Sequence, residues 1–175
     1  MTKFYTVDRC GTLRAGLAIE LVRYTDIKPP ELQIHVDEMF PGGVSSHGER
    51  YFLKAQQSPK LASPSTEILF EYVRRALYPH RPSRFQSVFA FESKDQAIIF
   101  SQKFGSGDEP IWEVEAKESF RGDMNLLTTG PSILVWSYFA NKYWKGEPGT
   151  DPFWEVLLVP PVHVIHKIQR GQRPH

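Results

Sequence analysis

The chain has very little cysteine, no long hydrophobic run and almost no net charge. Cys10 is the only cysteine among 175 residues, which excludes an internal disulfide and any cluster of thiolate metal ligands. No stretch approaches the ~20 apolar residues that a membrane-spanning helix needs. The first residues also lack the apolar core of a secretory signal. These absences predict a cytoplasmic protein that does not enter a membrane.

The formal net charge of +1 means that no global field attracts a polyanion. Contact with nucleic acid would therefore depend on a local patch. One such patch is the stretch 74–85, in which arginines and a histidine alternate with Tyr78 and Phe85. The same charges also fit a solvated helix end and loop.

Familiar cofactor and metal motifs are missing. Gly105-Ser106-Gly107 lacks the third glycine of a dinucleotide-binding turn and leads into Asp108-Glu109-Pro110. His163 and His166 are three residues apart on an expected strand, so they point to opposite faces and cannot easily share a metal ion. We therefore expect no metal site.

Apolar residues make up 41% of the chain and charged residues 23%, as in folded globular proteins, and we expect one domain over residues 1–175. Short apolar or alternating runs predict strands. They cover residues 3–8, 17–24, 32–36, 86–91, 111–116, 154–159 and 162–168. The last two flank a pair of prolines, and we expect them to form a hairpin.

Three segments carry helix signals. Ser63 followed by Pro64 is typical of an N-cap with proline at the first helical position. Ser93 and Gln96 form a capping box, and Pro131 opens an aromatic-rich third helix. Strands predominate without regular strand–helix alternation, so the sequence predicts an α+β fold with antiparallel sheets.

Glu155 lies inside an otherwise apolar strand, Phe153-Trp154-Glu155-Val156-Leu157-Leu158. A carboxylate in that position costs free energy unless it faces solvent or is paired. Alternation puts it on the face opposite Trp154 and Val156. The pattern alone fits both an exposed, inert glutamate and a working carboxylate.

Short segments in a particular order accompany this strand. They are Phe4-Tyr5-Thr6 with Leu13-Arg14-Ala15-Gly16, the loop 41–48, Ser87-Val88-Phe89-Ala90-Phe91 with Asp95-Gln96-Ala97, and Ile111-Trp112-Glu113-Val114-Glu115 running on to Asp123-Met124-Asn125-Leu126. Together they resemble the NAD-dependent ADP-ribosyltransferase family, nearest in order to the small rifamycin-modifying enzymes. The resemblance implies a split antiparallel β-sandwich with flanking helices, in which residues 49–82 are a helical insertion.

The terminal strand is similar to the Glu-Val-Leu-Leu-Pro strand that carries the family's catalytic glutamate. The resemblance therefore implies that Glu155 is the catalytic carboxylate and that NAD is the co-substrate. Cleavage of the nicotinamide–ribose bond develops an oxocarbenium ion, which a carboxylate stabilises most strongly in the transition state. Asp123 is an alternative carboxylate, because the antibiotic-modifying group has a functional aspartate in that region.

The resemblance also implies a cofactor site. Thr6 stands where the antibiotic-modifying enzymes have histidine, so Arg9 is the better candidate to anchor NAD from the first strand. Ser87 would shape the nicotinamide pocket, and His47 and Gly48 would border the cofactor. Each also fits a plain structural role: a surface arginine, a backbone-bonded serine and a turn histidine.

Aromatic and basic residues complete the set of candidates. Tyr143, next to Trp144, would stack on nicotinamide or the target, or else pack in the core. Phe153 occupies the position where arginine-directed transferases carry Glu or Gln, which argues against a protein arginine as acceptor. With Phe153, we expect Arg81 and Arg84 to contact the acceptor, and their basic stretch favours a nucleic acid.

Three functions remain open from the sequence. The first is a mono-ADP-ribosyltransferase acting on a nucleic acid, a protein or a small molecule, such as a toxin, defence factor or effector with an antitoxin or inhibitor as partner. The second is a non-catalytic domain of the same fold that binds NAD, a nucleotide or a partner. The third is an NAD glycohydrolase, in which water replaces the acceptor.

Overall fold

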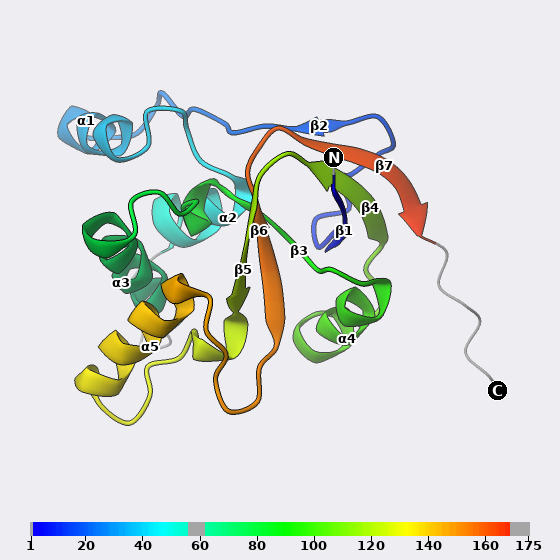
Figure 1. The fold of residues 1–175 in the computed structure, drawn as a ribbon. Helices are drawn as coiled ribbons and strands as arrows, with labels where there is room; N and C mark the ends of the chain where they lie inside the picture. Colours follow the sequence, from blue (N-terminus) through cyan, green and yellow to red (C-terminus); the bar gives the residue numbers. More distant parts are fainter. Residues whose placement is uncertain (1, 56–61, 169–175) are drawn as a thin grey trace.

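Two antiparallel sheets form the centre of the molecule. The structure is a computed structural model that describes residues 2–55 and 62–168. The four-stranded sheet has the order β1-β4-β7-β2, and the three-stranded sheet has the order β3-β6-β5 (Figure 1). This arrangement confirms the α+β class with antiparallel sheets.

The strands of the first sheet come from both ends of the sequence. They are β1 (Thr2–Val7), β4 (Ile111–Ala116), β7 (Val162–Ile168) and the short β2 (Ala18–Ile19). The second sheet holds β3 (Val88–Ala90), β6 (Trp154–Leu158) and β5 (Ser119–Asp123). A single bridge between Tyr5 and Phe91 connects the two sheets where β1 passes β3.

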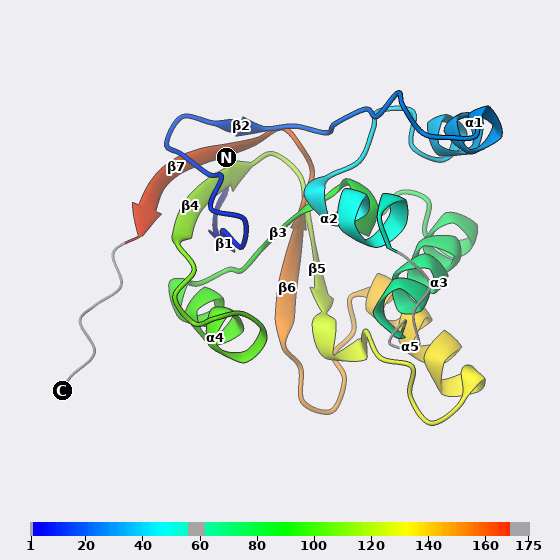
Figure 2. The same ribbon diagram turned by 180° about the vertical axis from the view of Figure 1, so that it is seen from behind.

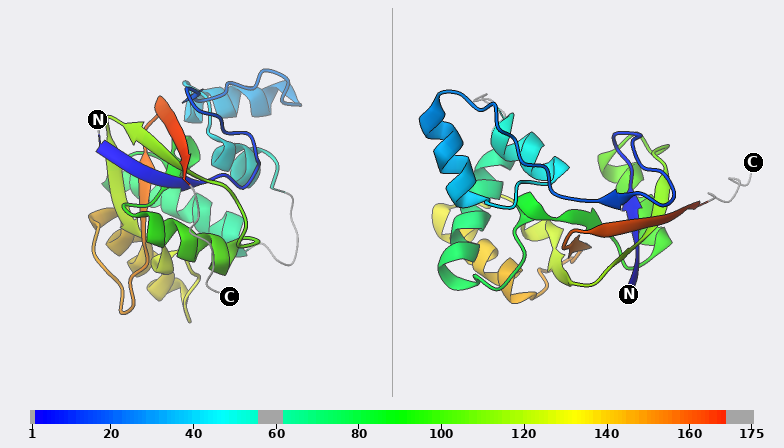
Figure 3. Two further views of the ribbon diagram at one scale, coloured as in Figure 1. Left: turned by 90° about the vertical axis from the view of Figure 1, so that its right-hand side faces the viewer. Right: turned by 90° about the horizontal axis from the view of Figure 1, so that it is seen from above.

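Helices cover one side of the three-stranded sheet. This side carries α2 (Ser46–Gly48), α3 (Ala62–Leu77) and α5 (Ile133–Lys145), and the other side packs against the four-stranded sheet (Figures 1 and 2). Helix α4 (Lys94–Phe104) contacts β1 and β4 of the four-stranded sheet. Single turns link these elements: η1 (Glu49–Leu53), η2 (Arg84–Gln86) and η3 (Met124–Leu126). The remaining helix, α1 (Pro30–Met39), lies at the opposite end of the molecule from β7 (Figure 3). None of the helices in the described residues is long and apolar enough to span a membrane.

Alternation along β6 divides the core. Val156 and Leu158 pack with Phe4 and Val114 between the two sheets. Leu157 points the other way, into a cluster under α3 and α5 that includes Trp144. Glu155 has the same parity as Leu157, so its side chain faces the helices and not the four-stranded sheet.

Several local expectations are confirmed. Strand β4 covers the expected residues 111–116. Ser93 caps α4 by accepting a hydrogen bond from the backbone of Gln96, and Ser132 caps α5 just after Pro131. A helix also forms where Ser63 and Pro64 predicted one, but α3 begins at Ala62, so Ser63 is inside it and is not the N-cap.

Other local expectations are wrong. Residues 32–36 form the centre of α1 and not a strand, because Pro30 at the first helical position starts a helix that buries none of its side chains. Only residues 18–19 of the expected strand 17–24 are extended in a sheet. Strand β5, which pairs with β6, had no expected counterpart.

The terminal hairpin is also absent. Both edges of β6 are already paired, one with β3 and the other with β5. Strand β7 therefore joins the other sheet, between β4 and β2. Val159, Pro160 and Pro161 carry the chain from one sheet to the other.

Candidate functional site

A buried guanidinium organises the polar centre of the molecule. Arg84 is only 3% exposed and contacts two carboxylates, Glu67 and Glu155. It donates two hydrogen bonds to Glu67, from Nε to Oε2 at 2.7 Å and from Nη2 to Oε1 at 3.0 Å. Its Nη1 donates to Oε1 of Glu155 and, at 2.6 Å, to the hydroxyl of Tyr143. We call His47, Glu67, Arg84, Tyr143 and Glu155 the Arg84 cluster.

The glutamate that the sequence singled out is the inner end of this cluster. Glu155 is 4% exposed, which excludes the interpretation of an exposed, inert side chain. The Tyr143 hydroxyl donates to Glu155 Oε1 at 2.8 Å, so two donors converge on that oxygen. No described residue donates a hydrogen bond to the other oxygen, Oε2.

His47 forms the outer end of the cluster. Its Nε2 lies 3.1 Å from Glu67 Oε1, and its ring centroid lies 4.4 Å from that of Phe89 on β3. The ring of Tyr51 also packs against the His47 ring, with the two centroids 4.5 Å apart. The loop 41–48 that the sequence predicted to border a cofactor therefore reaches Glu155 through Glu67 and Arg84.

Local backbone features set these positions. Ser83 caps η2 by accepting a hydrogen bond from the Phe85 amide, and this turn directs Arg84 inward. On β5, Gly122 lies directly opposite Glu155. A Cβ atom at Gly122 would come within 2.4 Å of the Tyr143 ring. The bare glycine therefore makes the space in which Tyr143 reaches the carboxylate.

Electrostatics keep Glu67 and Arg84 ionised. Burial alone would raise the pKa of Glu67, but attraction by Arg84 and His47 outweighs it and lowers the pKa below the ordinary 4.5. Burial likewise opposes the charge on Arg84, yet Glu155 and Glu67 raise its pKa well above the usual value. Burial, followed by the charge on Glu155, raises the pKa of Tyr143, so its hydroxyl stays a donor.

Four of the candidate residues therefore meet in one place: Glu155, Tyr143, His47 and Arg84. Arg84 was expected to belong to an exposed basic patch that contacts an acceptor, but it is buried and engaged by carboxylates. Gly48 lies beside His47 for a packing reason, since an added Cβ would stand 2.3 Å from the carbonyl oxygen of Phe85.

The first-strand and second-strand candidates bond to the backbone. Thr6 is buried and donates to the carbonyl of Phe89 at 2.7 Å, and Ser87 donates to the carbonyl of Ser83 at 2.7 Å. Arg9 is exposed and donates to the carbonyl of Phe104 at 3.3 Å. Ser87 thus stands just before β3, the neighbour of β6, and Thr6 stands on β1 of the other sheet; neither joins the Arg84 cluster.

Asp123 has a separate role in the architecture. Its fully buried carboxylate accepts hydrogen bonds from three backbone amides, those of Asn125 at 3.0 Å, Phe153 at 2.9 Å and Gly149 at 2.7 Å. These bonds tie the end of β5 to the loop that enters β6. Asp123 therefore fixes the start of the strand that carries Glu155.

The remaining two candidates lie apart from the cluster. Phe153 precedes β6 and packs against Phe91 and against Phe104 of α4, away from the Arg84 cluster. The guanidinium of Arg81 lies 4.7 Å from the centre of the Phe120 ring. Trp144 packs in the core and donates to the carbonyl of Phe70 at 2.7 Å.

Glu67, the carboxylate that joins His47 to Arg84, was not among the residues predicted for the site. It was read only as part of a helix, although it precedes Ile68 and Leu69 on an amphipathic segment. A second carboxylate on the same helix, Glu71, is buried with Arg74 at 2.8 Å and Arg75 at 2.7 Å. The sequence signal that could have identified Glu67 is the presence of two glutamates, Glu67 and Glu71, on the buried face of one helix. Within the described residues, no group of His, Cys, Asp and Glu side chains is arranged to hold a metal ion.

The family of the chain follows from a match to a family model. Residues 44–170 match the model described as protein of unknown function, DUF2441. The chain belongs to the DUF2441 family. The matched range contains every member of the Arg84 cluster, whereas β1, with Thr6, lies before it. No curated protein matches the chain significantly.

Adding a methyl group at Gly122 tests the packing that positions Tyr143. We expect Gly122→Ala to lower the free energy of unfolding by about 1–3 kcal/mol, because the new Cβ overlaps the ring. Urea denaturation measures the change. Gly42→Ala is the matched control, since its Cβ would meet only Leu21 at 3.7 Å. Equal stability of the two variants would contradict the proposed packing.

The lowered pKa of Glu67 predicts a dependence of stability on pH. A carboxylate with a depressed folded pKa stabilises the fold above pH 4.5, and this contribution is lost as the pH falls toward the folded pKa. We expect Glu67→Gln to lose about 2 kcal/mol at pH 7 and to show a shallower decline below pH 4.5 than the wild type. Urea titrations from pH 7 to 3 check this. Glu147→Gln, at an exposed glutamate, should parallel the wild type; a Glu67→Gln curve of the same shape would refute the assignment.

Proposed function

We propose that this DUF2441 protein is a mono-ADP-ribosyltransferase that cleaves NAD and uses Glu155 as its catalytic carboxylate. One observation carries the proposal. The three segments that resemble the family's motif strands are β1, β3 and β6, and these are consecutive neighbours, since β3 pairs with β6 and bridges to β1. Residues that must contact one NAD molecule from three strands need this adjacency.

The charge of the Arg84 cluster supports the same function. Two carboxylates, Glu67 and Glu155, face one guanidinium, which leaves one negative charge when His47 is neutral. NAD carries a positive charge on its nicotinamide ring, and bond cleavage moves that charge to the ribose. A buried negative centre is complementary to both forms and acts most strongly where water is excluded.

The hydrogen bonds of Glu155 support a catalytic role as well. Arg84 and Tyr143 hold Oε1 from two directions, and this fixes the plane of the carboxylate. Oε2 is the oxygen that would take a ribose hydroxyl and face the developing oxocarbenium ion. Nicotinamide leaves as a neutral molecule, so the step needs no general acid.

A second candidate is a domain of the same kind that binds NAD, a nucleotide or a partner without catalysis. The burial of Glu155 favours it, because a carboxylate that is 4% exposed and bound to a guanidinium must be uncovered before it can meet a ribose. The acceptor in the first candidate is a nucleic acid, a protein or a small molecule; water as acceptor would make the protein an NAD glycohydrolase.

Replacement of one carboxylate distinguishes these functions. We expect the wild type to release nicotinamide from NAD, and Glu155→Gln to slow release by about 10²- to 10³-fold, because the stabilisation of the oxocarbenium ion is lost. The measurement is chromatographic detection of nicotinamide, with and without cell extract. Glu71→Gln is the control. It also removes the charge of a buried carboxylate that is paired with arginine, but Glu71 lies outside the Arg84 cluster.

Each alternative has its own outcome in this assay. Nicotinamide release without transfer of label from NAD to any component of the extract would identify a glycohydrolase. Binding of NAD by calorimetry without release would support the non-catalytic candidate. Equal release by wild type and Glu155→Gln would eliminate Glu155 as the catalytic residue.

A further inference from the structure

The basic stretch 74–85 divides into two groups in the structure. Arg74, Arg75 and Arg84 are paired with buried carboxylates, so their charges are satisfied inside the protein. His80 and Arg81 form no ion pair with any described residue, and both line a surface hollow of about 230 Å³. Only this second group can offer positive charge to a ligand.

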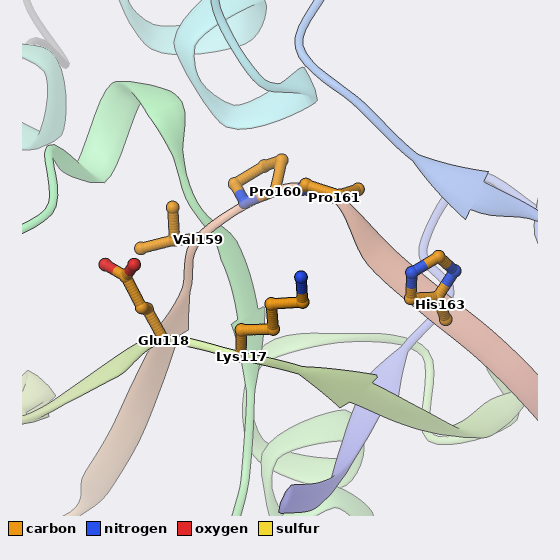
Figure 4. A pocket seen from close by; sticks show the side chains of 6 residues that line it. All are labelled: Lys117, Glu118, Val159, Pro160, Pro161 and His163. Carbon is orange, nitrogen blue, oxygen red and sulfur yellow. The ribbon is translucent and has the colours of Figure 1, made fainter. Parts of the chain in front are cut away.

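A lysine and a histidine from elsewhere in the sequence lie beside His80 and Arg81. A second hollow, of about 130 Å³, shares Glu118, Val159 and Pro160 with the first and is also lined by Lys117 and His163. The side chain of Lys117 extends toward the two prolines, with Glu118 and His163 on either side (Figure 4). We call the two adjoining hollows the Pro160 groove.

One buried donor in the lining of the groove lacks a hydrogen-bond partner, and the floor of the groove is apolar. The Nε of Arg81 is buried and has no hydrogen-bond partner, which is uncommon for an arginine nitrogen. Lys117 and His163 form no ion pair with a described residue, and Glu118 is the only carboxylate in the lining. Val159 and the two prolines supply flat apolar surface between the charges. These donors call for an anion with several oxygen acceptors.

We propose that the Pro160 groove binds the phosphate groups of a nucleic-acid strand. Each hollow is smaller than the ~300 Å³ or more of a site that encloses a whole small molecule, so it accommodates one group of a ligand that continues across the surface. A strand meets this condition because its phosphates repeat along the backbone. Contacts of this kind position a strand without reading its sequence.

The groove lies close to the Arg84 cluster. Val159 lines it and directly follows β6, four residues after Glu155, a distance of about 13 Å at ~3.3 Å per residue. Ser83, which also lines it, is the neighbour of Arg84. The groove therefore adjoins the segments that carry Glu155 and Arg84, but the binding site itself does not depend on NAD cleavage and is tested without NAD.

Two charge changes of opposite sign test the site. The probe is a fluorescein-labelled single-stranded RNA of eight nucleotides, followed by fluorescence anisotropy at low salt. We expect Lys117→Glu to weaken binding about tenfold and to reduce the steepness of the salt dependence by about one counterion. We expect Glu118→Gln to tighten binding, because it removes the only carboxylate of the lining. Lys167→Glu, an equal change at an exposed lysine of β7 outside the groove, should leave affinity within about twofold.

The outcomes separate the proposal from its rivals. Loss of binding with Lys117→Glu together with a gain with Glu118→Gln establishes the groove. Displacement of the RNA by adenosine monophosphate at a similar concentration would assign the same phosphate site to a free nucleotide. Equal weakening by Lys117→Glu and Lys167→Glu, or no binding of the RNA or of the mononucleotide to the wild type, would overturn the proposal.

Discussion

The guanidinium of Arg84 is the interaction on which the interior depends. It joins Glu67 of α3 to Glu155 of β6 and contacts Tyr143 of α5, so one side chain connects two helices to the middle strand of a sheet. Buried ion pairs contribute little net stability, because the desolvation of the charges offsets their attraction. They do require every partner to be present. The cluster therefore determines how α3 and α5 sit on the sheet more than how strongly they bind to it.

The burial of Glu155 in this cluster has two possible explanations, one structural and one catalytic. If the cluster is only structural, its charges serve to orient α3, α5 and β6. If it is catalytic, Arg84 and Tyr143 hold the carboxylate in one orientation, and the unbalanced second carboxylate attracts a positively charged ring or ribose. The adjacency of β1, β3 and β6 favours the catalytic explanation, because it places side by side the three segments that resemble the motif strands of ADP-ribosyltransferases.

The sequence predicted the parts of the fold that depend on local chemistry. Ser93 caps its helix because a short side-chain oxygen satisfies a free backbone amide, and this signal is contained within four residues. The sequence did not predict which strands pair with one another. Nothing near residues 154–168 indicates that β6 has both edges occupied, so the two strands were assigned to a hairpin. Residues 32–36 were wrongly predicted as a strand for a related reason. Their apolar and polar residues alternate, but neither set is buried in the structure.

The site was predicted in part for the same reason. A glutamate in an apolar strand signals a buried partner, but the partner's identity depends on which segments approach it. Arg84 was therefore read as surface charge, and Glu67 was not singled out. Asp123 resembled a functional carboxylate, whereas its oxygens accept hydrogen bonds from the neighbouring amide of Asn125 and from two amides, of Gly149 and Phe153, in a segment that is distant in sequence. Sequence identifies which residues need a partner, and topology decides who that partner is.

The crossing of the chain from β6 to β7 has a consequence for how the protein is made. Strand β6 is the central strand of one sheet, and β7 lies between two strands of the other. Neither sheet can close until residues 154–168 have left the ribosome, so the nascent chain before them holds open strand edges and an Arg84 with no Glu155 to meet. Such edges attract other strands. Ribosome stalling or truncation just before residue 154 should therefore yield a species prone to aggregate, and not a smaller version of the native fold.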